Sequence, residues 1–100
     1  MTTTYQIVYW REIPAQVRLR TPLGRVSRPL SARFQEAIDA AAMRAQATST
    51  DDYLEEWRTS EAQSREGDPE LVAETVVDEI EAAYPQERLL ALAANGGFEK

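Results

Sequence analysis

Apolar and polar side chains alternate near the start of the chain, which is typical of β-strands. The run Tyr5–Trp10 is rich in aromatic and β-branched residues, and alternation places apolar side chains on both of its faces. We therefore expect an inner strand. In Gln16–Thr21, aliphatic residues alternate with Arg18 and Arg20. This pattern predicts a second strand, antiparallel to the first and buried on one side.

Proline and glycine mark the end of the second strand. Thr21–Gly24 has proline in its second position and glycine in its fourth, which a type I turn prefers. Arg25–Pro29 then reads as a short extended return, and Pro29 would keep it at the edge of the sheet.

Three later segments show the three- and four-residue apolar spacing of amphipathic helices. The first follows Ser31, a residue type favoured at the N-cap, and the second begins at Asp68-Pro69, an N-cap followed by proline. The third begins at Pro85 and ends at Asn95–Gly97. The first helix has a continuous apolar stripe of Phe34, Ala37, Ile38, Ala41, Ala42 and Ala45. The expected buried stripe of the second is Ala73, Val76, Val77, Ile80, Ala83 and Tyr84, and the third carries Leu89, Leu90, Leu92 and Ala93.

The segment Asp51–Arg65 is compatible with either type of structure. Tyr53, Leu54 and Trp57 fit one turn of a helix, whereas Tyr53 and Trp57 also fit one face of a strand. Periodicity over so short a run does not separate the two.

The chain contains no cysteine and no histidine, which excludes disulfides, thiolate nucleophiles, imidazole bases and the common zinc sites. Neighbouring carboxylates in Asp51–Glu56 would point apart on a helix or a strand, so acid–base catalysis by them is not expected. The same segment lacks the glycine and ligand spacing of a calcium loop and is expected to be a solvated surface. We expect no enzyme, no metal and no cofactor.

The net charge of −6 is the sum of two unlike halves. Residues 1–46 hold seven arginines against three acids, and residues 47–100 hold fourteen acids against four bases. An acidic chain is a poor nucleic-acid binder, so no nucleic acid is expected. The arginines would be solvated or paired with the acidic helix; the alternative is a segregated basic face. Met1–Tyr5 does not resemble a signal peptide and no apolar run could span a membrane, so a cytoplasmic location is expected.

The run Tyr9–Val17, YWREIPAQV, resembles the signature of the bacterial virulence factor domain family. The resemblance extends over about residues 5–95, with further matches at Arg33-Phe34, Ala37–Asp39, Ala42-Met43, Asp52–Leu54 and Trp57. Members of the family occur as short stand-alone proteins. Others form a module of larger proteins resembling conserved virulence factor C, beside an iron–sulfur-scaffold-like domain and helical repeats. The Trp57 region of relatives is strand-like, so the resemblance favours a strand within Asp51–Arg65.

Together these expectations describe an α+β protein in the order β-β-α-β-α-α. A small antiparallel sheet of two to three strands would carry two to three helices packed on one face. The length fits a single domain with a modest core, which disfavours a deep enclosed active site. We place the domain at residues 1–95 and expect residues 96–100 to form a fraying C-terminal tail.

The candidate binding residues gather around the end of the first strand. Trp10 and Trp57 would act as aromatic anchors, because tryptophan and arginine are common hot-spot residues at interfaces. Arg11 and Arg33 would bind a carboxylate or a phosphate. The alternative is that both tryptophans belong to the core and the proline only shapes the connection. The full candidate set is Trp10, Arg11, Pro14, Gln16, Arg33 and Trp57.

We therefore expect a non-enzymatic adaptor or accessory protein that binds a protein partner. The resemblance links stand-alone members to corrinoid- and folate-linked methyl transfer, which implies a partner in methyltransferase or corrinoid machinery. The alternative is a small-ligand or anion-binding accessory to such methyl transfer, using the arginine-rich strand face. An enzyme is the least favoured class.

Overall fold

The computed structural model describes residues 2–22, 24–46 and 50–99. The fold is α+β, as the sequence predicts. Its elements in chain order are β1 (Thr2–Trp10), β2 (Ile13–Thr21), β3 (Gly24–Pro29), α1 (Ala32–Arg44), α2 (Thr50–Glu55), β4 (Trp57–Thr59), β5 (Gln63–Glu66), α3 (Pro69–Ala83) and α4 (Gln86–Ala94).

One antiparallel sheet contains all of these strands, and β1 lies at its centre. β2 pairs with one side of β1, and β3 continues the sheet as an edge strand. The other side of β1 is shared, because β4 pairs with Val8–Trp10 and β5 with Thr2–Tyr5. This arrangement confirms the inner position predicted for the first strand and the edge position predicted for Arg25–Pro29.

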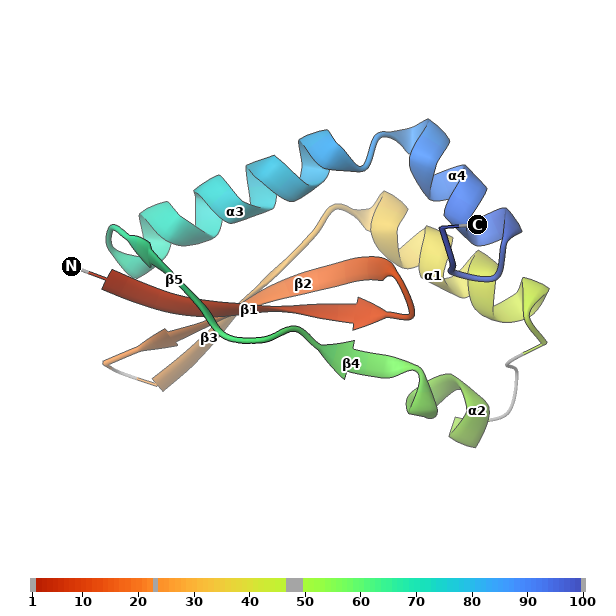
Figure 1. Cartoon of the computed structure of the whole chain (residues 1–100), viewed down its shortest axis with the longest axis horizontal. Coiled ribbons are helices and arrows are strands. Elements are labelled where there is room, and N and C mark those ends of the chain that lie inside the picture. Colours follow the sequence, from red (N-terminus) through yellow and green to blue (C-terminus); the bar gives the residue numbers. More distant parts are fainter. Residues whose placement is uncertain (1, 23, 47–49, 100) are drawn as a thin grey trace.

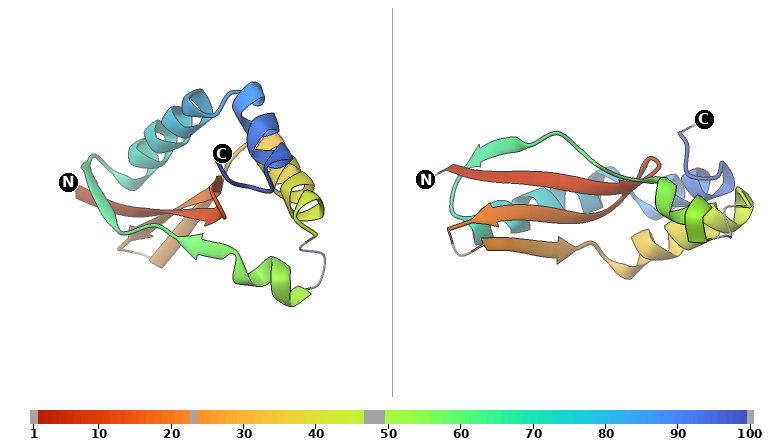
Figure 2. Two further views of the ribbon diagram at one scale, coloured as in Figure 1. Left: turned by 45° about the vertical axis from the view of Figure 1, so that its right-hand side comes forward. Right: turned by 90° about the horizontal axis from the view of Figure 1, so that it is seen from below.

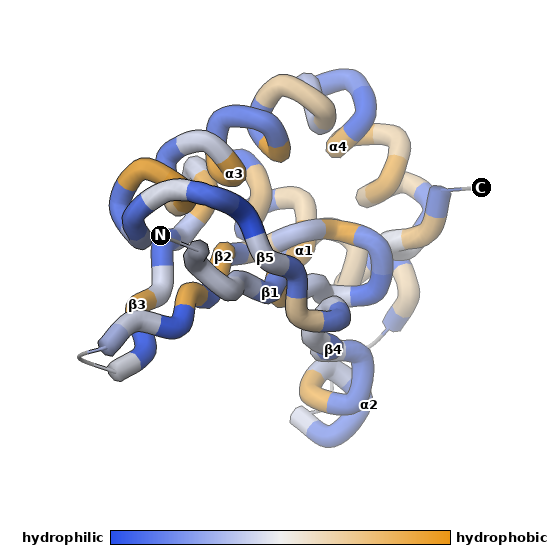
Figure 3. The backbone as a smooth tube through the Cα atoms, turned by 60° about the vertical axis from the view of Figure 1, so that its left-hand side comes forward, coloured by the Kyte–Doolittle hydropathy of each residue, from blue (hydrophilic) through white to orange (hydrophobic). Residues whose placement is uncertain are grey.

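The helices lie mainly on one side of the sheet. Figure 1 shows α3 and α4 along this side, with α1 packed beside α4. Along α3, hydrophobic and hydrophilic stretches alternate with each turn (Figure 3), as expected for a helix that packs on a sheet through one face. Among the described residues, no helix covers the opposite side of β2, β3 and most of β1 (Figure 2), and α2 packs only at the end of β1, where Tyr53 stacks on Trp10. That side is called the open side below.

The hydrophobic core fills the space between the sheet and the helices. Its main contributors are Tyr5, Ile7, Val17 and Leu19 from the sheet, Phe34 and Ile38 from α1, Val72 and Val76 from α3, and Leu89 and Leu92 from α4. Ala83, expected in a buried stripe, is exposed at the end of α3, and Leu90 is 60% exposed. The buried residues of α4, Leu89, Leu92 and Ala93, keep the three- and four-residue spacing, which turns Leu90 outward.

The expected order of elements is wrong in detail. Asp51–Arg65 contains both structures that its pattern allows, since α2 occupies its start and β4 and β5 follow. These strands have only three and four residues and are mostly exposed. They form because they pair with the free side of β1, which no local periodicity reveals.

Two local predictions at strand ends also change. β2 begins at Ile13 rather than Gln16, and Pro14 is accommodated at a register shift opposite Val8 and Tyr9, where proline is tolerated. The predicted type I turn includes Leu23, which lies outside the described residues.

The helix caps differ from each other. The backbone N–H of Leu71 donates to Oδ1 of Asp68 at 2.8 Å, which confirms the predicted cap of α3. Ser31 occupies the N-cap position of α1, but its hydroxyl does not cap the helix. It donates instead to Oε1 of Glu81 at 2.9 Å.

The residues that follow α4 are held against the turn between β1 and β2, where a fraying tail was expected. Gly96 and Gly97 are buried, and the N–H of Glu12 donates to the carbonyl of Gly97 at 2.9 Å. A Cβ at Gly97 would come within 3.1 Å of Trp10 and Arg11, and its φ of +99° also favours glycine. Lys100 lies outside the described residues.

Candidate functional site

Arg11 lies in the turn between β1 and β2, and its charge is bound within the chain. Its guanidinium carbon lies 5.0 Å from the ring centre of Trp10 and 4.8 Å from that of Phe98. Nη1 donates to the carbonyl of Gly96 at 2.8 Å, and Nε lies 3.4 Å from a carboxylate oxygen of Glu56. The carboxylate that Arg11 contacts therefore belongs to its own chain, whereas the sequence predicts that Arg11 binds a carboxylate or phosphate of a partner or ligand.

The two tryptophans have different environments. Trp10 is 0% exposed, stacks on Tyr53 at 5.8 Å and donates its Nε1–H to the Tyr53 carbonyl at 2.8 Å. Trp57 is only partly buried and meets the same tyrosine ring edge-on at 5.9 Å. Trp10 thus belongs to the core, which was the alternative interpretation, whereas Trp57 retains an accessible surface.

Arg33 projects from the first turn of α1 and joins that helix to the end of α3. It donates to the backbone carbonyls of Tyr84 and Glu81, and its Nη2 lies 2.8 Å from Oε1 of Glu81. Desolvation raises the pKa of the Glu81 carboxyl, but hydrogen bonds from Ser31 and Arg33 outweigh this effect, so the net pKa is lowered. All of these partners lie in α1 and the end of α3, so Arg33 does not join Trp10 and Arg11 in one site.

Pro14 and Gln16 also lie in different environments, one buried and one at the surface. Pro14 is among the most completely buried side chains. Gln16 lines a surface cavity of about 270 Å³ together with Val8, Arg18 and Trp57. The expected site therefore divides, with Trp10, Arg11 and Pro14 in or against the core, and Gln16 and Trp57 at this cavity.

Three further arginines extend the surface beside Gln16. The strand register places Arg20 directly opposite Arg25, and Arg18 opposite Ser27. Since side chains alternate between faces, Arg18, Arg20 and Arg25 share the open side of the sheet. All three are exposed, and none forms an ion pair with any residue that the structure describes.

A second cavity of about 160 Å³ lies between these arginines, lined also by Thr4 and Gln6 of β1. It shares Arg18 with the 270 Å³ cavity. The 270 Å³ cavity is lined also by Arg58 and Thr59. The two cavities form one surface that carries Trp57 at one end and Arg20 and Arg25 at the other. We call this surface the open arginine face and define it by Gln6, Val8, Gln16, Arg18, Arg20, Arg25 and Trp57.

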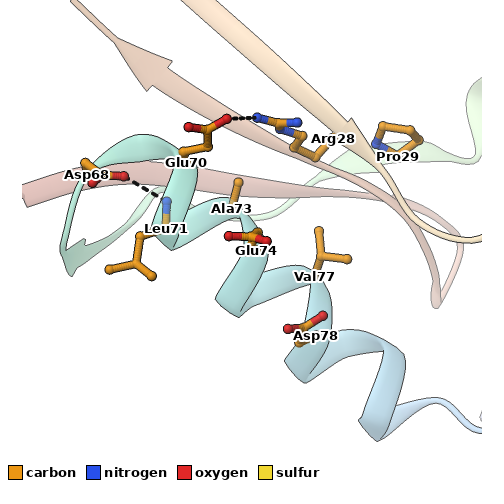
Figure 4. Close-up of a pocket in the computed structure, with 9 residues that line it drawn as sticks. All are labelled: Arg28, Pro29, Asp68, Glu70, Leu71, Ala73, Glu74, Val77 and Asp78. Carbon is orange, nitrogen blue, oxygen red and sulfur yellow. Dashed lines mark hydrogen bonds and ion pairs between the residues drawn. The ribbon is translucent and has the colours of Figure 1, made fainter.

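A larger cavity of about 490 Å³ lies between β3 and α3 (Figure 4). Its charged lining is mainly acidic, with four carboxylates that include Glu74 and Asp78 of α3 against Arg28 of β3, which lies 3.6 Å from Glu70. Its wall includes Ala73 and Val77 of α3. The two sides of the sheet therefore present cavities of opposite charge. The arginines of the basic cavity come from the first half of the sequence, and the acids of the other cavity come from the second half.

The charged residues offer little for metal binding. Among residues 2–22, 24–46 and 50–99, no three histidine, cysteine, aspartate or glutamate side chains converge where they could hold a metal ion. No helix within the same residues is long and apolar enough to cross a membrane.

The candidate set from the sequence omits Arg18, Arg20 and Arg25. A signal for the first two was present, because arginine alternates with aliphatic residues along Gln16–Thr21 without an intervening acid. Arg25 required the register between β2 and β3, which places it beside Arg20.

Comparison with known proteins relates the chain to one described family. Searches of curated proteins and of solved structures each found no significant match. The model of the virulence factor family matches residues 8–93, which include the β1–β2 turn, Arg33, Trp57 and nearly all of α4. On this evidence the chain belongs to the virulence factor family.

Proposed function

We propose that this protein is a non-enzymatic adaptor that binds a protein partner through the open arginine face. The observation that carries this proposal is the presence of three exposed guanidinium groups without an ion-pair partner among the described residues. The chain has 17 acidic residues, so acids are not scarce. Arg33, Arg65 and Arg88 each bind one of them at 2.8 Å or less.

The placement of these arginines costs folding free energy. Arg20 and Arg25 face each other across β2 and β3, and like charges directly opposite in a sheet are destabilising by roughly 0.2–1 kcal/mol. A partner carboxylate between the two guanidiniums would offset this repulsion. An acidic partner surface is therefore the complement that the face lacks.

The dimensions of the face favour a macromolecule over a small ligand. Its cavities measure about 160 and 270 Å³, whereas pockets for small molecules usually measure about 300–1,000 Å³. Trp57 and the arginines are also the residue types that dominate protein interfaces. Within protein partners, methyltransferase or corrinoid machinery is the class that the family resemblance suggests.

Site-specific photocrosslinking in cells that naturally make the protein tests the proposal. A benzophenone side chain would replace Ser27, which is exposed on β3 and opposite Arg18, and, as a matched control, Ala82, which is exposed on α3. We expect one protein adduct from position 27, none from position 82, and loss of the adduct in the R18E/R20E variant. Equal adducts from both positions, no adduct, or an adduct unaffected by charge reversal would refute the adaptor function.

A second candidate function is binding of a small anion in the 160 Å³ cavity, since three guanidiniums border it. Inorganic phosphate, folates and corrinoids would be screened by thermal shift. A ligand at one hundred times its Kd stabilises the folded state by about 2.7 kcal/mol, which is readily measured. A rise in Tm that R20T abolishes would support this function, and the absence of any rise would exclude it for these compounds.

A further inference from the structure

The open arginine face has a direction along its strands. Val8 pairs with Gln16, Gln6 with Arg18, and Thr4 with Arg20. Successive pairs on one face of a sheet are about 6.8 Å apart, because each residue of an antiparallel strand rises about 3.4 Å. The row of Val8, which is largely buried, therefore lies about 14 Å from the row of Arg20 and Arg25. Trp57 pairs with Trp10, one row beyond Val8, and its side chain borders the same cavity as Val8.

On β1 and β2, which carry most of this face, side chains are offered but no free backbone groups, because these strands use theirs in pairing within the sheet. An extended segment lying on it would leave its own N–H and C=O groups without partners in the protein. An α-helix satisfies its backbone internally and presents only side chains. A helix is therefore the occupant that the chemistry of the face favours.

Helical spacing also matches the rows of the face. Residues four apart in a helix are about 6 Å apart along its axis, and residues eight apart are about 12 Å apart. These values are close to the 6.8 and 14 Å that separate the row of Val8 and Gln16 from the rows of Arg18 and Arg20.

We propose that the partner segment on the open arginine face is an α-helix with an apolar residue at position i and Asp or Glu at i+4 and i+8. The apolar residue enters the 270 Å³ cavity above the buried Val8 and packs beside the partly exposed ring of Trp57. The first acid binds Arg18, and the second binds Arg20 and Arg25. This inference rests on the proposed function and specifies the partner that the same face takes.

The test uses a synthetic 19-residue alanine-based peptide with leucine at i and glutamate at i+4 and i+8. A matched control peptide of the same composition carries its glutamates at i+2 and i+6, which turns them to the other side of the helix. A third peptide contains a central proline that breaks the helix. Binding to the full chain would be followed by amide chemical shifts in two-dimensional NMR at low salt, with peptide helicity measured by circular dichroism.

We expect the patterned peptide to bind at least tenfold more tightly than the rotated or proline-containing peptide, with shifts at Gln6, Val8 and Arg18. The R18E/R20E variant should lose at least tenfold in affinity. R44E should not, because Arg44 is exposed at the end of α1 and outside the face. Equal affinity for all peptides, no binding, shifts at the β3–α3 cavity, or tighter binding of an oligonucleotide to the same residues would overturn the inference.

Failure of this inference and failure of the proposed function give different results. If Ser27 crosslinks a protein in a charge-dependent manner but the patterned peptide does not bind, the adaptor function stands and the helical partner is wrong. If the peptide binds the face but no cellular protein crosslinks there, the adaptor function fails although the face prefers an acidic helix.

Discussion

The arginines on the two sides of the sheet differ in what they contact. On the side of the helices, Arg28, Arg33 and Arg65 reach acids of α3 at 3.6, 2.8 and 2.7 Å. On the open side, Arg18 and Arg20 lie on the same strand as core residues but have no carboxylate partner among the described residues. The number of arginines in the first half of the chain therefore says little about binding. Their pairing separates charges that support the fold from charges available to a partner.

The two tryptophans also differ, since one packs inside the protein and the other lies at its surface. Trp10 is enclosed by Tyr53 and the residues after α4, whereas Trp57 borders the open arginine face. An aromatic residue at a strand end can lie in the core or at the surface. Here Trp10 of β1 lies in the core, and Trp57 of β4 lies at the surface.

The largest effect is expected from Trp10→Ala. Truncating a fully buried tryptophan costs about 3–5 kcal/mol, and the Tyr53 carbonyl also loses its hydrogen bond. Urea denaturation should show this loss, with a clearly smaller one for Trp57→Ala. Equal destabilisation by both variants would contradict the assignment of one tryptophan to the core and the other to the surface.

Arg33→Ala should have the next largest effect. The substitution leaves the carbonyls of Tyr84 and Glu81 and the Glu81 carboxylate without their donor, and hydrogen bonds to charged groups contribute about 1.5–3 kcal/mol. Arg18→Ala, on the open side, serves as the control and should change the free energy of unfolding by less than about 0.5 kcal/mol. A comparable loss in both variants would remove the distinction between paired and available arginines.

The free energy of unfolding, measured as a function of pH, should show the titration of the Glu81 carboxyl. Its pKa in the folded state is lowered from the ordinary value of 4.5. The stabilisation is therefore complete above pH 4.5 and is lost as the pH falls toward and below the folded pKa. Glu81→Gln should lower stability at neutral pH and flatten the acid side of the profile. An unchanged acid side in this variant would show that Glu81 is not the group responsible.

The smallest effect is expected from Arg20→Thr, and it has the opposite sign. Removing the repulsion from Arg25 and introducing a residue favoured in strands should stabilise the protein by about 0.2–1 kcal/mol. The same variant should bind the patterned helical peptide more weakly. A loss of stability, or unchanged peptide binding, would contradict the view that this arginine serves recognition at the expense of the fold.

Much of the fold follows from local pattern. The first two strands, the edge strand and three helices were expected, because each has enough residues for its period to be recognised or has a distinct cap or breaker. α2, β4 and β5 have six, three and four residues. The structure of these short elements depends on Tyr53 reaching Trp10 and on the free side of β1.

The candidate surface was predictable in part. Trp57 and Gln16 belong to it, and the alternation in Gln16–Thr21 indicated that Arg18 and Arg20 share a face. Arg11 and Arg33 lie outside this surface because they pair with Glu56 and Glu81. These partners are 45 and 48 residues away in sequence, so local pattern does not reveal them. Side-chain chemistry alone does not distinguish an arginine that binds its own chain from one that is free to bind another.

The sequence by itself determined the fold class, the inner strand, the amphipathic helices and a chain whose two halves carry opposite charge. Each of these depends on neighbouring residues or on composition. Tertiary structure decided which tryptophan is buried, which arginines are paired and which side of the sheet remains open. These properties depend on contacts between residues far apart in the chain, which arise only when β1 acquires its partners and the helices cover one side.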